Sequence, residues 1–190
     1  MLAYLVLLLA VLSRILPHAF HAVSWNFTAL GGGLLFFGSR MGGSKRAAWM
    51  LPSAVAVLMA TDYYLTVFAY QYPFQVSTYL VTWLWYAAVC LLGMGILQKP
   101  SMLRVAAGVL ASSTSFFLLS NFVVWMDGSM SMYPHSLAGL SACYVAGLPF
   151  YRNDLASTAL TAGALFGLPV LAARIADSLH DAHRNDLPMI

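Results

Sequence analysis

Charged side chains are scarce in this chain of 190 residues. Asp, Glu, Lys and Arg together make up 8% of it, whereas a soluble domain carries roughly 25%. Glutamate is absent, and the six acidic residues are all aspartate. Because hydrophobic residues reach 61%, a water-soluble fold would lack the polar groups to cover its surface. The composition therefore predicts an integral membrane protein.

Motifs for catalysis and metal binding are lacking as well. The two cysteines, Cys90 and Cys143, lie in apolar runs without the spacing of a zinc site or a redox pair, which indicates small buried side chains. The five histidines show no metal-binding spacing, and there is no P-loop, GxSxG or GxGxxG motif. The glycine run at 31–33 follows no predicted strand and is interpreted as a packing feature. We therefore expect no enzyme activity, no cofactor and no metal.

A basic patch is the third absence. The formal net charge is +3, yet the nine Lys and Arg are scattered singly or in one pair. A nucleic-acid-binding protein would gather them into a stripe or an arm. We therefore expect no nucleic-acid partner, and attribute the positive excess to cytoplasmic loops of a membrane protein.

Six segments are predicted to be transmembrane helices, because each approaches the length and apolarity that a bilayer requires. They cover residues 2–16, 27–42, 47–68, 76–97, 103–125 and 154–176. The first lacks the basic start and the cleavage site of a signal peptide, so we expect it to be retained. The fold class is thus an all-α polytopic membrane bundle, with one transmembrane domain over 1–176 and a polar cytoplasmic tail over 177–190.

The stretch 137–150 is apolar but short for a span. Ser136 is a candidate N-cap and Pro149 a candidate end, which predicts a re-entrant or interfacial helix over 137–149. A seventh span is the alternative. Basic residues cluster in the connections after the second, fourth and sixth predicted helices. By the positive-inside rule this favours six spans with both termini in the cytoplasm, since a seventh would move the last arginines outside.

Intramembrane polarity is concentrated in the predicted outer half of the bundle. Asp62 is the one acid deep within a predicted helix, and a buried charge there must be paired, with Arg14 and Arg152 as candidate partners. We interpret the outer cluster as the lining of an outward-facing cavity; the alternative is an ion pair that only fixes helix register. The predicted substrate-binding residues are Arg14, Trp25, Asn26, Asp62, Asn121, Trp125, Tyr133, His135 and Arg152.

Aromatic residues crowd around the connection between the third and fourth predicted helices. An interfacial aromatic belt explains most of them, whereas rings that face a cavity would stack on a planar ligand. Small residues recur four apart at Gly38 and Gly42, and again at Ala159, Gly163 and Gly167. This spacing allows close helix packing in lipid.

The run over 133–153 and several shorter motifs resemble a known family. The shorter motifs are Ser120-Asn121-Phe122 with Trp125, and Asn26-Phe27-Thr28 after Ser13-Arg14 and Pro17-His18. Together they resemble a family of uncharacterised bacterial membrane proteins related to the substrate-binding S components of energy-coupling factor (ECF) transporters.

This resemblance implies a six-helix subunit of the bacterial cytoplasmic membrane. It would bind a vitamin-like micronutrient in an outward-facing pocket and would be driven by a transmembrane coupling protein and two ATPases. The alanines of the first helix, Ala3 and Ala10, are seven apart, which departs from the small-residue motif that docks the coupling protein in many S components. The alternative function is a membrane scaffold without a ligand, and a membrane enzyme ranks last because no nucleophile or metal set is visible.

Overall fold

The protein is a bundle of six α-helices in the computed structural model, which describes residues 1–19, 27–127 and 132–185. The helices are α1 (Leu2–Ala19), α2 (Leu30–Ser39), α3 (Ser44–Tyr64), α4 (Val76–Ile96), α5 (Met102–Met126) and α6 (Leu137–Asn185). A π-helical turn, η1 (Leu65–Ala69), continues α3. No strand occurs in these ranges, so the predicted all-α class is confirmed.

Four of the helical segments are long and apolar enough to cross a membrane: α3 with η1, α4, α5 and α6. The apolar parts of α1 and α2 are shorter. At ten residues, α2 is about 15 Å long, roughly half the hydrocarbon thickness. The prediction of a span over 27–42 was therefore too long, since the described helix covers only its middle.

The short helix α2 forms the centre of the bundle, and nine of its ten residues are buried. It packs against α1, α4, α5 and α6. Its glycines permit these approaches: a Cβ on Gly38 would lie 2.0 Å from the carbonyl oxygen of Cys90 in α4, and one on Gly31 would lie 2.4 Å from the hydroxyl of Thr158 in α6. The interpretation of the glycine run as a packing feature is confirmed.

The last helix corrects the sequence-based boundaries. The predicted re-entrant helix over 137–149 and the predicted span over 154–176 are one continuous helix, α6, with Pro149 and Pro169 inside it. Ser136 caps it as predicted, because its Oγ accepts a hydrogen bond from the Gly139 amide at 3.1 Å. An interior proline costs about 3 kcal/mol, but α6 packs along α5 on both sides of Pro149, and this packing keeps the chain helical. The continuous helix also excludes a separate seventh span.

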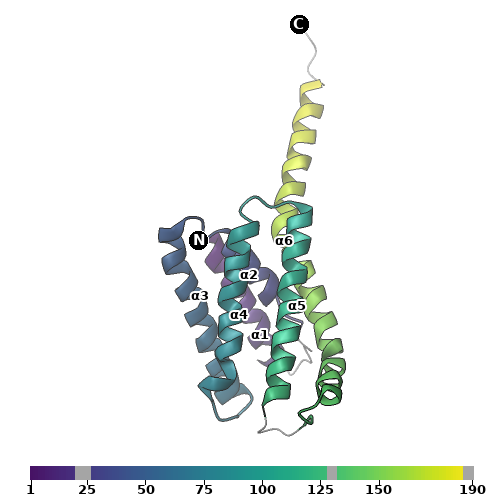
Figure 1. The fold of residues 1–190 in the computed structure, drawn as a ribbon. Coiled ribbons are helices and arrows are strands. Elements are labelled where there is room, and N and C mark those ends of the chain that lie inside the picture. The colour runs from purple at the N-terminus through teal and green to yellow at the C-terminus, as the bar shows by residue number, and fades with distance from the viewer. Residues whose placement is uncertain (20–26, 128–131, 186–190) are drawn as a thin grey trace.

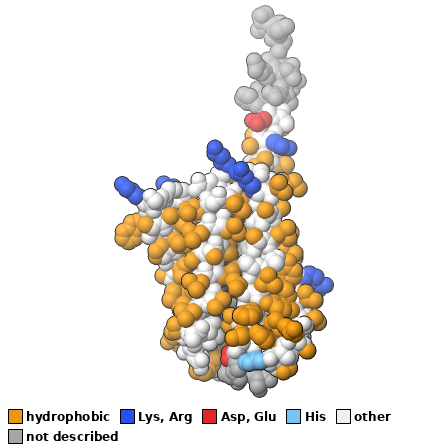
Figure 2. Space-filling model, in the orientation of Figure 1, with side chains coloured by type: hydrophobic (Ala, Val, Ile, Leu, Met, Phe, Trp, Pro, Cys, Tyr) orange, Lys and Arg blue, Asp and Glu red, His pale blue; other side chains and the backbone are white. Residues whose placement is uncertain are grey.

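The helices run alternately up and down, so both chain ends lie at the same end of the bundle (Figure 1). The 2–3 and 4–5 connections are at that end too, and α6 extends beyond it. In Figure 2 hydrophobic side chains cover the visible flank, while most of the visible Lys and Arg gather at the end from which α6 projects. This distribution is the one that a bilayer-spanning bundle requires.

Candidate functional site

A buried ion pair links the first and third helices. Arg14 of α1 donates from Nη2 to Oδ1 of Asp62 in α3 at 2.5 Å. The Asp62 side chain is 2% exposed, which confirms that this acid faces the bundle interior. A charge at such a position requires a partner because low-dielectric surroundings penalise an isolated ion.

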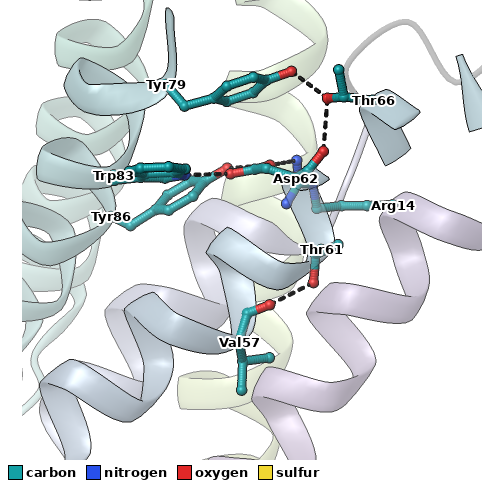
Figure 3. Close-up of polar contacts among 8 residues, drawn as sticks. All are labelled: Arg14, Val57, Thr61, Asp62, Thr66, Tyr79, Trp83 and Tyr86. Atoms are coloured by element: carbon teal, nitrogen blue, oxygen red, sulfur yellow. Dashed lines mark hydrogen bonds and ion pairs between the residues drawn. The ribbon is translucent and has the colours of Figure 1, made fainter. Parts of the chain in front are cut away.

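Two side chains of α4 complete the surroundings of the carboxylate. The indole Nε1 of Trp83 donates to Oδ2 of Asp62 at 3.0 Å, and the hydroxyl of Tyr86 donates to Oδ1 at 3.2 Å. Figure 3 shows Trp83 and Tyr86 of α4 and Arg14 of α1 converging on Asp62 of α3. Both carboxylate oxygens are therefore engaged, and the Arg14 guanidinium also lies 6.0 Å from the centre of the Tyr86 ring.

The backbone around Asp62 changes from an α-helix to a π-helix within one turn. The Tyr70 amide bonds to the Leu65 carbonyl at 2.8 Å, and the Thr66 hydroxyl donates to the Asp62 carbonyl at 2.7 Å. The same hydroxyl is 2.5 Å from the hydroxyl of Tyr79 in α4 (Figure 3). A π-turn is rare and frequently marks a functional site; here it ties the C-terminal end of α3 to α4 beside the ion pair.

A cavity of about 140 Å³ lies next to this pair. Four aromatic side chains line it: Tyr79, Trp85, Tyr86 and Phe116. Its polar lining consists of Arg14, Thr28, Asp62, Thr82 and Asp154. These residues come from α1, α3, α4, α5, α6 and the segment before α2, so the cavity lies among the helices of the bundle.

Some polar atoms around the cavity have no partner. Arg14 Nη1 and Asp154 Oδ2 are buried without a hydrogen bond to any described residue, and so is the hydroxyl of Thr158 one turn after Asp154. The Asp154 residue is 8% exposed. A buried donor or acceptor left unsatisfied costs about 1–3 kcal/mol, so such atoms in native proteins are normally met by water or a ligand. The cavity thus has the polar groups of a binding site in addition to its shape.

The predicted residues of the outer α5–α6 connection lie apart from the cavity. Trp125 Nε1 donates to the Pro134 carbonyl at 3.0 Å, and its ring meets that of His135 edge-on at 5.6 Å. Asn121 donates to the Phe117 carbonyl at 2.8 Å and sits against Gly147 of α6. Tyr133 is half-buried in the loop before α6. These contacts hold α5, the loop and α6 together, and none of the four residues lines the cavity.

Arg152 is the clearest departure from the predicted site. It is exposed on α6 and makes no ion pair with a described residue, so among the described residues only Arg14 forms an ion pair with Asp62. The neighbouring Tyr151 bonds to the hydroxyl of Thr114 at 3.0 Å, which places this level of α6 at the middle of α5. The prediction placed Arg152 at an outer helix start, because it divided α6 at Pro149. The predicted site residues Trp25 and Asn26 lie outside the described residues.

Sequence reasoning missed Asp154 and the aromatic walls. The signal for Asp154 was the polar triplet that it forms with Ser157 and Thr158 on one face of α6, all three buried. Of the aromatic residues near the 3–4 connection, Tyr63, Tyr64, Tyr70 and Tyr72 are exposed, as an interfacial belt requires. Phe74, Tyr79 and Trp83 stack on one another beside the ion pair. The belt interpretation thus fits these exposed tyrosines, while Tyr79 is among the rings that line the cavity.

A second hollow, of about 770 Å³, is an apolar groove between α5 and α6 toward the end from which α6 projects. Ala159, Gly163 and Gly167 line it, and a Cβ on either glycine would meet nothing within 4 Å. The close helix packing that this spacing allows therefore does not occur at Gly163 and Gly167 within the described residues. Of the other pair, Gly38 packs closely whereas Gly42 lies beyond α2 in open space. The groove lacks the converging polar groups of the smaller cavity.

No group of three or more His, Cys, Asp or Glu residues in the described ranges could hold a metal ion.

Comparison with known proteins identifies the family. No protein of curated function and no solved structure matches the chain. A family of unknown function, DUF6580, matches residues 1–179. Since this match covers nearly the whole sequence, the chain is a member of the DUF6580 family.

Proposed function

We propose that the protein is a membrane subunit that binds a small solute in the cavity between Arg14, Asp62 and Asp154, in the manner of an ECF-type S component. The observation that carries the proposal is a pair of unpartnered groups beside a cavity within the bundle: Arg14 Nη1 and Asp154 Oδ2 are buried without hydrogen bonds to described residues, and both side chains line the 140 Å³ cavity. A solute with an acceptor and a donor would satisfy them.

The remaining elements of the proposal concern orientation and energy. The end of the bundle that holds both chain ends and the basic connections is assigned to the cytoplasm by the positive-inside rule. The cavity lies beside the outer ends of α1 and α3, so the solute would enter from the outside of a bacterial cytoplasmic membrane. As the sequence has no nucleotide-binding motif, transport would need energising subunits, such as those of ECF systems.

Helix α1 bears on how such subunits would dock. Ala3 and Ala10 are 7% and 1% exposed, and Ala10 packs against Gly33 of α2. These alanines therefore face the core and offer no small-residue surface for a coupling protein. This agrees with their spacing of seven residues, which departs from the small-residue motif that docks the coupling protein in many S components. An ECF-type partner would have to bind elsewhere on the bundle.

The alternative function, a scaffold without a ligand, is favoured by one observation. Asp62 has a partner for each of its oxygens, as a purely structural ion pair requires. A scaffold also predicts a solid interior, however, and the cavity with the unpartnered Asp154 Oδ2 contradicts this second requirement. We therefore place solute binding first.

The test is to purify the full chain from membranes into lipid nanodiscs and extract it for mass spectrometry. We expect a small molecule to copurify with the wild type and to be lost from Arg14→Gln, while Asp177→Asn on the projecting part of α6 retains it. A panel of vitamins in a thermal-shift assay provides the second measurement. The proposal fails if no molecule copurifies and no solute in the panel raises the melting temperature.

A further inference from the structure

The dimensions of the cavity limit what it can hold. Its volume is about 140 Å³, and an apolar cavity of about 150 Å³ accommodates one benzene molecule. A fused bicyclic ring or a long chain would not fit without movement of the helices. A solute held here in the described conformation is therefore about the size of a single six-membered ring.

The walls favour a flat molecule over a compact aliphatic one. Phe116 and Trp85 pack against each other with ring centroids 4.7 Å apart, and Tyr79 and Tyr86 add two more rings to the lining. Aromatic faces and edges pair most favourably with another aromatic ring. The phenol hydroxyls of both tyrosines are already engaged, with Thr66 and Asp62.

The free polar atoms set the pattern of donors and acceptors. Arg14 Nη1 is a donor without an acceptor, and Asp154 Oδ2 is an acceptor without a donor. They are not within ion-pair distance of each other. A ring that presents both a hydrogen-bond acceptor and an N–H donor on its rim would satisfy both.

The charges around the cavity select against an anion. The positive charge of Arg14 is balanced by Asp62 in the same ion pair, so Asp154 is the acidic group of the lining outside that pair. When ionised, this carboxyl repels a second negative charge and favours a neutral N–H donor or a cation. The cavity is thus distinct from an arginine site built for a free carboxylate or phosphate.

We propose that the cavity binds a flat nitrogen heterocycle of one six-membered ring, neutral or singly positive, with N–H donors toward Asp154 and an acceptor toward Arg14. This inference rests on the proposed function and specifies its substrate class. It assigns Asp154 as the residue that distinguishes a basic or neutral ring from an acidic one.

Three probes of ring size test the class on the full chain in nanodiscs: 2-aminopyridine, whose neutral form has the required donor and acceptor; toluene, which has neither; and benzoate, which is an anion. Binding is measured by thermal shift and by saturation-transfer NMR. We expect 2-aminopyridine to bind at least about tenfold more tightly than the other two, because one hydrogen bond to a charged group contributes this much or more. Equal binding of toluene, or equal or tighter binding of benzoate, overturns the proposal.

Variants then locate the binding. Asp154→Asn is expected to weaken the binding of 2-aminopyridine by about tenfold or more and to change the affinity for toluene by less than about twofold. The control Asp177→Asn is expected to change neither affinity. If Asp154→Asn does not fold, Phe116→Leu replaces it. Loss of one aromatic wall should weaken the binding of 2-aminopyridine and of toluene to the same extent. Unchanged binding of 2-aminopyridine in the folded variant overturns the proposal.

The outcomes also separate this inference from the function on which it rests. Tight binding of benzoate that depends on Arg14 would overturn the heterocycle class but leave a solute-binding subunit. The same division follows if none of the three probes binds while a larger molecule copurifies. If no probe binds and nothing copurifies, both proposals are overturned.

Discussion

Replacing Asp62 with asparagine is the sharpest test of the buried ion pair. Asp62 is 2% exposed and receives hydrogen bonds from Arg14, Trp83 and Tyr86. Asparagine keeps the shape but removes the charge, and its amide nitrogen would set a donor against one of these donors. The Arg14 guanidinium, 16% exposed, would be left without its ion-pair partner in the bundle interior.

The expected cost follows from this geometry. Breaking a buried ion pair by removing one partner destabilises a protein by about 3–5 kcal/mol. For a chain of this size each kcal/mol lowers the melting temperature by roughly 2–4 °C, so we expect a fall on the order of 10 °C. Tryptophan fluorescence during heating in nanodiscs measures it, because Trp83 contacts the replaced group.

Two controls decide whether the pair is responsible. Asp177→Asn makes the same chemical change at an exposed position of α6 and should shift the melting temperature by less than about 2 °C, since surface substitutions stay within about 0.5 kcal/mol. The double variant Arg14→Met/Asp62→Leu should recover most of the lost stability, because apolar residues replace buried ion pairs at little cost, yet it should bind no solute. The reasoning is refuted if Asp62→Asn is no more destabilising than Asp177→Asn.

Three further predictions concern packing and orientation. Gly38→Ala should destabilise the bundle by about 1–3 kcal/mol in thermal unfolding, since its methyl would meet the backbone of α4. Gly163→Ala, in open space, should be neutral or stabilise the protein by up to about 1 kcal/mol. Equal effects of the two substitutions on stability would contradict this prediction. Trp125→Phe should lower the free energy of unfolding by about 1 kcal/mol, because it loses the hydrogen bond to the Pro134 carbonyl, and it should leave the affinity for 2-aminopyridine unchanged. Single cysteines at Ser101 and Tyr72 should react with an impermeant maleimide from opposite sides of the membrane, Ser101 from the cytoplasm; labelling from the same side would refute the topology.

The sequence by itself determined the class of the protein and the interior position of Asp62. Hydropathy depends on local composition, and its sum over some 20 residues decides whether a helix is stable in lipid. The same local argument places an intramembrane carboxylate away from the acyl chains, whatever its neighbours are. Arg14 was one of two candidate partners on the basis of depth alone, and the structure selected it over Arg152.

The tertiary structure decided which groups share a space. Whether α6 continues through Pro149 depends on its packing along α5, a long-range contact that outweighs the local proline signal. That continuity carries Asp154 into the bundle and Arg152 to its exterior. The rotation of each helix about its axis brings Trp83, Tyr86 and Asp154 to one cavity, and this rotation follows from side-chain interlocking among all six helices, which no local window of sequence encodes.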